Sequence, residues 1–145
     1  MKTRKKRLSV IMLCLIIIGV VLIAFTTSCS KSKSDNNANF SGTFYGALAS
    51  GLYSEADTIV ITNSSSSAIV MKTRTGRGST YTINGTVNGS ALNIASQSVY
   101  IPSSEATYTV SGSGNLTDNS NLVIHYAFVS TANATTNLTF TGIRK

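Results

Sequence analysis

The sequence predicts a single all-β domain, an antiparallel meander of about eight or nine strands that closes into a small barrel or a two-layer roll. Two observations support this fold class. From Phe40 onward, apolar and polar residues alternate with period two, and clusters of Gly, Asn and Ser interrupt the alternation at regular intervals. No window shows a helical period of apolar residues. Residues 40–145 are enough for one domain with one core and too few for two.

The expected strands lie between turn signals. The strongest signal is Asn88-Gly89, because a two-residue type I′ hairpin needs a positive φ at both central positions. Residues 63–67 and 117–121 mark looser hairpin loops. Pro102 ends a strand, where its missing N–H costs no ladder hydrogen bond. The expected strands are 41–49, 57–63, 68–75, 79–87, 91–95, 97–101, 106–116, 121–129 and 137–144.

Strand 121–129 is apolar on both faces. One face carries large residues, and the other carries Val123, His125, Ala127 and Val129. This pattern indicates a central strand covered on both sides, or a barrel strand whose outer face meets a partner. Strand 137–144 repeats the trend and is expected to pair beside it. The large residues of the first face are Leu122, Ile124, Tyr126 and Phe128.

A weak internal repeat favours curvature of the sheet. Residues 81–85 (YTING) realign on residues 108–112 (YTVSG), and each copy runs through a turn into a Leu-x-Ile strand. The repeating unit is therefore a β-hairpin with a glycine in its first strand, where a bend or bulge can form. Bent hairpins let a sheet close, and closure removes exposed edges.

The N-terminal segment has the layout of an export signal. Five basic residues lie in positions 1–7, an apolar stretch follows to Phe25, and small polar residues precede Cys29. We expect residues 1–28 to be a lipoprotein signal peptide. Residues 29–39 would be an acylated Cys29 and a flexible tether, and residues 40–145 the β domain. An uncleaved membrane anchor and ordinary secretion are the alternatives.

Composition excludes several function classes. The chain has 12 basic and 5 acidic residues, but five of the basic ones belong to the export signal, so the net charge does not indicate nucleic-acid binding. The two cysteines, Cys14 and Cys29, both precede the β domain. That domain can therefore form no disulfide, thiol nucleophile or cysteine metal site. We expect no metal and no cofactor.

Three short motifs in the domain carry a family resemblance. They are Gly42-Thr43-Phe44-Tyr45-Gly46, Ser111-Gly112-Ser113-Gly114 and the closing residues 140–145 (FTGIRK). With the cysteine after the apolar segment, the chain resembles small lipocalin-like β-barrel lipoproteins of Bacteroidota. The resemblance implies acyl chains on Cys29, a lipid anchor in the cell envelope and location at the outer membrane.

Catalytic chemistry is hard to assemble from these residues. His125 lies in the middle of an apolar strand, and we expect it to be structural or partly exposed rather than a base. Glu55 and Asp57 lie two apart before an expected strand and could share a cation. Two carboxylates without further oxygen ligands fall short of a calcium site, so we interpret them as a solvated start of the strand.

Three further features suggest binding or modification. Lys72, Arg74 and Arg77 form a basic cluster that could hold a phosphate, sulfate or acidic glycan, or could keep an edge strand soluble. Asp57-Thr58-Ile59 resembles the acceptor motif for O-glycosylation of exported Bacteroidota proteins, with Thr58 as acceptor. The six tyrosines could stack on sugars or fill the core.

The function expected from the sequence is therefore non-enzymatic. The first hypothesis is an exported, lipid-anchored module that binds a glycan or an envelope protein. The alternative is a lipocalin-like carrier of a small apolar ligand. A carrier needs a cavity lined by Tyr and Leu and open at one end, and a roll filled by the large residues of strand 121–129 would exclude it. A hydrolase, the third hypothesis, would need a polar cluster around His125.

Overall fold

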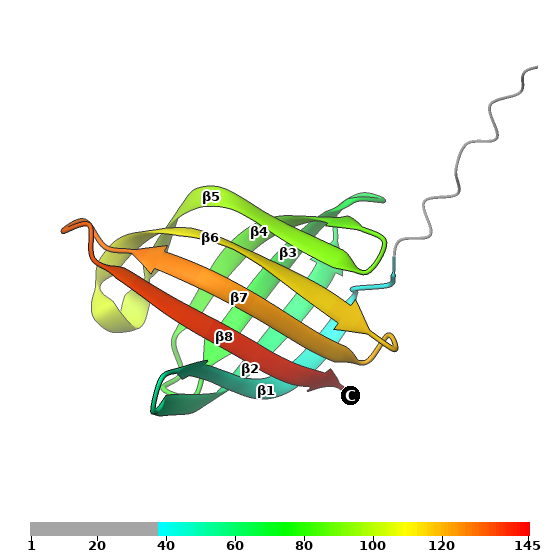
Figure 1. Cartoon of the computed structure of the whole chain (residues 1–145), viewed down its shortest axis with the longest axis horizontal. Coiled ribbons are helices and arrows are strands. Elements are labelled where there is room, and N and C mark those ends of the chain that lie inside the picture. Colours follow the sequence, from blue (N-terminus) through cyan, green and yellow to red (C-terminus); the bar gives the residue numbers. More distant parts are fainter. Residues whose placement is uncertain (1–37) are drawn as a thin grey trace, which may run out of the picture. The chain divides into compact units, whose positions relative to one another are not determined.

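A computed structural model describes residues 38–145, which form a closed β-barrel (Figure 1). Eight antiparallel strands follow one another in chain order, and the last pairs with the first. The predicted all-β fold is confirmed, as a barrel and not a two-layer roll. The strands are β1 (Gly42–Ser50), β2 (Tyr53–Asn63), β3 (Ala68–Thr75), β4 (Thr80–Asn88), β5 (Ala91–Ile101), β6 (Ala106–Thr117), β7 (Asn121–Val129) and β8 (Thr135–Arg144), with a 3₁₀ helix, η1 (Pro102–Ser104), after β5.

The structure does not describe residues 1–37. The predicted signal peptide, the predicted acylation site Cys29 and most of the predicted tether belong to this segment. Between Ala38 and Lys145, no helix has the length and apolar character that crossing a bilayer as a helix requires.

Two strand predictions were wrong. The predicted strands 91–95 and 97–101 are one strand, β5, whose register against β6 shifts between Ile94 and Gln97. This bulge leaves Ala95 and Ser96 both exposed, which breaks the alternation and imitates a turn. Strand β2 begins at Tyr53 and not at residue 57, so Glu55 and Asp57 lie inside the strand. The other six strands lie within two residues of their predicted bounds.

The turn between β4 and β5 also differs from the prediction. Asn88 pairs with Ala91, so the central residues are Gly89 and Ser90, and of these two Gly89 alone has a positive φ, of 59°. A type I′ turn at Asn88-Gly89 is therefore wrong. The observed register pairs Val87 with Leu92 inside the barrel and leaves Ser90 in the turn.

Inward-facing residues of all eight strands form one core. On β7, the four large residues face inward and are all buried, and β8 pairs beside β7 as expected. The most deeply buried side chains include Phe40, Phe44, Phe140, Ile59, Ile61, Ile69, Met71, Ile83, Leu92, Ile94, Leu122 and Ile124.

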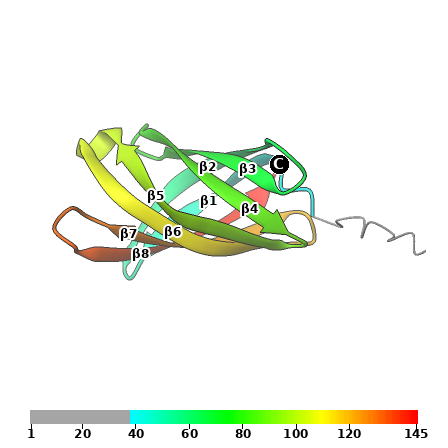
Figure 2. The same ribbon diagram turned by 90° about the horizontal axis from the view of Figure 1, so that it is seen from above.

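The two ends of the barrel are built differently. The first described residues and the C-terminus lie at one end, which we call the closed end, and η1 lies at the other, which we call the mouth (Figures 1 and 2). At the closed end Phe40 is fully buried, and the N–H of Ala38 donates to the carbonyl of Gly89 at 2.9 Å. The chain thus joins the barrel at the end opposite to the mouth.

The seam between β4 and β5 is the least paired junction. These strands pair at three positions, whereas β3 and β4 pair at seven. Beyond the three pairs the side chain of Gln97 spans the gap. Its Oε1 accepts the N–H of Asn84 at 2.9 Å, and its Nε2 donates to the Asn84 carbonyl at 2.7 Å. The Gln97 amide takes the place of a peptide group from a neighbouring strand.

Closure of the barrel depends on a pair of glycines. Gly46 of β1 lies opposite Gly142 of β8. A Cβ atom at Gly46 would overlap the carbonyl oxygen of Thr141 and the Cα of Gly142, so the two strands approach too closely here for a side chain.

We expect Gly46→Ala to destabilise the protein by about 3 kcal/mol, since the added methyl group must push β8 away from β1. Chemical denaturation of the full-length protein in mild detergent measures the effect. Gly51→Ala is the control, because Gly51 has a φ of 58° and no atom within 4 Å of the added Cβ. The control should cost only about 1 kcal/mol. Equal losses in the two variants would contradict the role of Gly46 in closure.

Candidate functional site

A cavity of about 240 Å³ opens at the mouth of the barrel. It receives residues from all eight strands and from η1, so no local stretch of sequence forms it. Below it, toward the closed end, the barrel is packed. The lining residues are Leu48, Glu55, Thr75, Tyr81, Ile101, Ser103, Ser104, Tyr108, Phe128, Thr136 and Leu138.

One wall of the cavity is apolar and aromatic. Phe128 of β7 packs edge-to-face with Tyr81 of β4 and Tyr108 of β6, at centroid distances of 6.3 Å and 6.2 Å. Tyr126 packs against Phe128 from below at 5.8 Å. Leu48 and Leu138 add aliphatic surface from β1 and β8. This wall can bury the body of a small ring-bearing molecule.

The opposite wall, on β2 and β3, is polar. Glu55 and Thr75 line the cavity, and Asp57 and Thr73 lie deeper on the same inward faces. Asp57 is paired with Thr75 across the two strands. Asp57 is 4% exposed, and Thr73 and Thr75 are 1% and 9% exposed.

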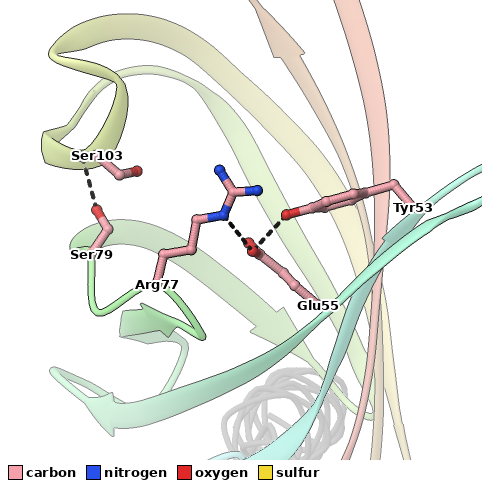
Figure 3. Close-up of polar contacts among 5 residues, drawn as sticks. All are labelled: Tyr53, Glu55, Arg77, Ser79 and Ser103. Atoms are coloured by element: carbon pink, nitrogen blue, oxygen red, sulfur yellow. Dashed lines mark hydrogen bonds and ion pairs between the residues drawn. The ribbon is translucent and has the colours of Figure 1, made fainter.

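The rim is held by polar contacts (Figure 3). Arg77, in the loop between β3 and β4, extends toward Glu55 of β2 and places its Nε 3.7 Å from Glu55 Oε2. The hydroxyl of Tyr53 donates to the same carboxylate oxygen at 2.6 Å. On the other side of the mouth, the N–H of Ser103 donates to Ser79 Oγ at 3.2 Å and ties η1 to the start of β4.

Asp57 is the most unusual group of the site. Its Oδ1 accepts the N–H of Thr58 at 2.8 Å, whereas its buried Oδ2 has no hydrogen-bond partner. Burial raises the pKa of the Asp57 carboxyl to about 7, the Thr58 N–H opposes this rise, and the charge of Glu55 adds to it. The interpretation of Asp57 as part of a solvated strand start was wrong, because β2 begins four residues earlier and turns Asp57 inward.

Other buried polar atoms near Asp57 also lack partners. They are the hydroxyl oxygens of Thr75 and Tyr126. Burial raises the pKa of both Tyr81 and Tyr126, and the charge of Asp57 raises both further. Buried polar groups in proteins are nearly always hydrogen-bonded. Water or a polar ligand would supply the hydrogen bonds that these atoms lack.

The basic residues singled out in the sequence are divided by the fold. Lys72 and Arg74 are exposed on the outer face of β3, whereas Arg77 lies at the rim and pairs with Glu55. The N–H of Gly78 donates to the Thr75 carbonyl at 2.8 Å and closes the loop. An anion site at Lys72, Arg74 and Arg77 stays a prediction. Thr58 faces outward on β2 and is partly exposed, and its glycosylation also stays a prediction.

His125 lies on the outer face of β7 and is exposed. Its Nδ1 lies 3.0 Å from Thr139 Oγ1 of β8. The tyrosines do not form one stacking surface, because Tyr45, Tyr53 and Tyr100 are exposed whereas Tyr81 and Tyr126 are buried in the barrel. In the described part of the chain, no three His, Cys, Asp or Glu side chains gather as a metal site would need.

The sequence interpretation missed Thr73 and Thr75 as site residues. A signal was present, since the inward face of β3 reads Ile69, Met71, Thr73, Thr75 and changes from apolar to polar along the strand. Such a change indicates the end of the barrel at which the packed apolar core ends and the interior becomes polar.

The stability of the barrel should decrease as pH rises through about 7. The ordinary pKa of an Asp carboxyl is 3.8, and in the folded barrel the Asp57 pKa is about 7. Between these values the folded state holds a proton that the unfolded state releases, so stability is present at low pH and is lost as pH rises. The loss attributable to Asp57 is up to about 4 kcal/mol.

Asp57→Asn should remove this dependence and make the protein more stable than wild type at about pH 8, because the variant buries no charge. Denaturant unfolding between about pH 4.5 and about pH 8.5 measures both proteins. Asp118→Asn, in the exposed loop between β6 and β7 at the closed end, is the matched control. The same pH slope in wild type and Asp57→Asn would show that Asp57 does not titrate as proposed.

No protein-family model and no curated protein sequence matches this chain. Solved structures match its fold. The structure of EF1p2_mFAP2b bound to DFHBI is 17% identical, with a TM-score of 0.59 over 77% of this chain and 100% of that chain. A redesigned β-barrel, mFAP1, also bound to DFHBI, is 14% identical, with a TM-score of 0.53 over 72% of this chain and 94% of that chain. At these identities the likeness establishes a shared barrel architecture and nothing more.

Proposed function

We propose that this protein is a binding barrel that holds one small, largely apolar molecule in its mouth. The observation that carries the proposal is the cavity of about 240 Å³, which is open at one end of a barrel whose other end is packed shut. Typical small-molecule pockets measure about 300–1,000 Å³, and an engineered apolar cavity of about 150 Å³ holds benzene. The expected ligand is therefore a single ring with short substituents.

The position of the packed core along the barrel supports this function, because a barrel filled with side chains along its whole length would leave no space for a ligand. Leu122 and Ile124 fill the closed half, whereas Phe128 stands beside the cavity with Tyr81 and Leu138. The cavity has Tyr and Leu side chains in its lining and is open at one end, which supports a carrier. Two barrels of similar architecture are bound to DFHBI, which supports small-molecule binding as a use of this fold.

The proposal extends to the place where binding occurs. We propose an exported, non-enzymatic lipoprotein of the lipocalin-like Bacteroidota type, acylated on Cys29 and held at the outer membrane. The basic n-region, the apolar stretch and the cysteine after it support this assignment. The first described residue, Ala38, joins the barrel at its closed end, opposite to the mouth.

Blocking the cavity should abolish binding of a ring-sized probe. Leu138→Trp places a large side chain into the cavity, and Ile143→Trp, on the outer face of the same strand, is the matched control. We expect the affinity for benzyl alcohol to fall at least about tenfold in Leu138→Trp and to stay unchanged in Ile143→Trp. Chemical-shift titration of the full-length protein in detergent measures both. An unchanged affinity in Leu138→Trp, or failure of wild type to bind, would overturn the proposed function.

The lipid anchor is tested by intact mass of protein extracted from membranes of its native host. We expect a mass that matches residues 29–145 plus acyl chains, and Cys29→Ala should lose both the cleavage and the lipid. Protease treatment of whole cells then tells whether the barrel is exposed at the cell surface. A mass that matches residues 1–145 without lipid would mean that the apolar segment is retained as an anchor.

A further inference from the structure

We infer that the molecule bound in the mouth is a small organic cation, with an ammonium group on an apolar body. This inference deepens the proposed function and rests on it. The mouth brings together three features that a cation needs and that a neutral or anionic ligand does not need together: two carboxylates, an aromatic corner and buried oxygen atoms without hydrogen-bond donors.

The carboxylates come from one strand. Glu55 and Asp57 both face inward from β2, and Glu55 lines the cavity itself. Among the described residues, the cation that contacts them is Arg77, whose side chain is 74% exposed and lies at the rim. Its separation from Glu55 is 3.7 Å, and Asp57 has no cationic partner in the described chain. Arg77 therefore balances Glu55 at the rim, whereas the ionised Asp57 carboxylate, deeper on the same strand face, is not balanced by a cation of the described chain.

The aromatic corner faces the carboxylates. Tyr81, Tyr108 and Phe128 all line the cavity, and the rings of Tyr81 and Tyr108 make interplanar angles of 88° and 71° with Phe128. Aromatic faces attract ammonium groups, and an aromatic corner with a carboxylate opposite is the arrangement that recognises alkylated ammonium ions.

The third feature is the set of unpartnered oxygen atoms. Thr75 lines the cavity, is 9% exposed, and its Oγ1 has no partner. Across the strand pair lies Asp57, whose Oδ2 also has none. An ionised carboxylate can only accept hydrogen bonds, so a ligand with N–H donors satisfies it and an anionic ligand is repelled. These buried atoms point to a donor that enters from the cavity.

Cation binding should depend on pH through Asp57. The ionisable groups that face Asp57 are Glu55 on its own strand, Tyr81 from β4 and Tyr126 from β7. From β1 the opposed residue is Gly46, and from β3 it is Thr75, so neither adds a charge. Protonation of Asp57 below about pH 7 removes the counter-charge, and affinity for a cation should weaken there.

Three probes of the same size and different charge test the inference: benzylamine, benzyl alcohol and benzoate. Chemical shifts of the Thr75 and Leu138 amides, in full-length protein in a non-ionic detergent, report binding at the mouth. At about pH 8 we expect benzylamine to bind at least about tenfold more tightly than benzyl alcohol, and benzoate to bind most weakly. At about pH 5.5 the advantage of benzylamine should shrink severalfold.

Asp57→Asn should shrink the same advantage at about pH 8, whereas Asp118→Asn at the closed end should change the affinity for neither probe. Glu55→Gln is a second variant with the same expected direction. Equal or tighter binding of benzyl alcohol in wild type would overturn the inference and leave the proposed function intact. If none of the probes shifts the mouth amides, the proposed function fails together with the inference.

Discussion

Hydrogen bonding between β8 and β1 closes the sheet, and the rest of the structure depends on this closure. Once the barrel is closed, the sheet keeps no long free edge, and each strand has one inner and one outer face. An eight-stranded barrel has an interior just wide enough to be filled by side chains. Which inward positions carry large residues then decides where the interior is solid and where it is hollow. The glycine pair Gly46 and Gly142 permits the close approach that closure needs.

The interior is divided along the barrel axis. Large apolar side chains fill the closed end, where Phe40 adds a residue that precedes β1. Toward the mouth, β2 and β3 contribute carboxyl and hydroxyl groups, while β6, β7 and β8 still contribute rings and leucine. The domain contains no cysteine, so packing in the closed half must offset the cost of the unpartnered polar atoms in the mouth. Stability and binding chemistry are thus placed in different halves of one small domain.

The β4–β5 seam runs along the barrel through both of these halves. Its few backbone pairs lie near the closed end, and Gln97 and the Ser79 to Ser103 hydrogen bond span the remainder toward the mouth. Side-chain bridges of this kind are weaker constraints than a continuous ladder, so the seam is the part of the wall that opens at least cost. Tyr81, which lines the cavity, lies on β4 beside it. Widening of the seam would move one aromatic side chain of the site.

Period-two alternation and turn residues were sufficient to predict the all-β fold, the pairing of β7 with β8 and the bounds of six strands. These features depend on neighbours close in sequence. Whether the interruption at Ala95 and Ser96 was a turn or a bulge depended on β6, which pairs across it. The burial of Asp57 depended on where β2 begins and on Thr75 opposite. The mouth cavity could be predicted from local sequence even less. Its charge, aromatic rings and size come from side chains that meet only when eight strands close in one register.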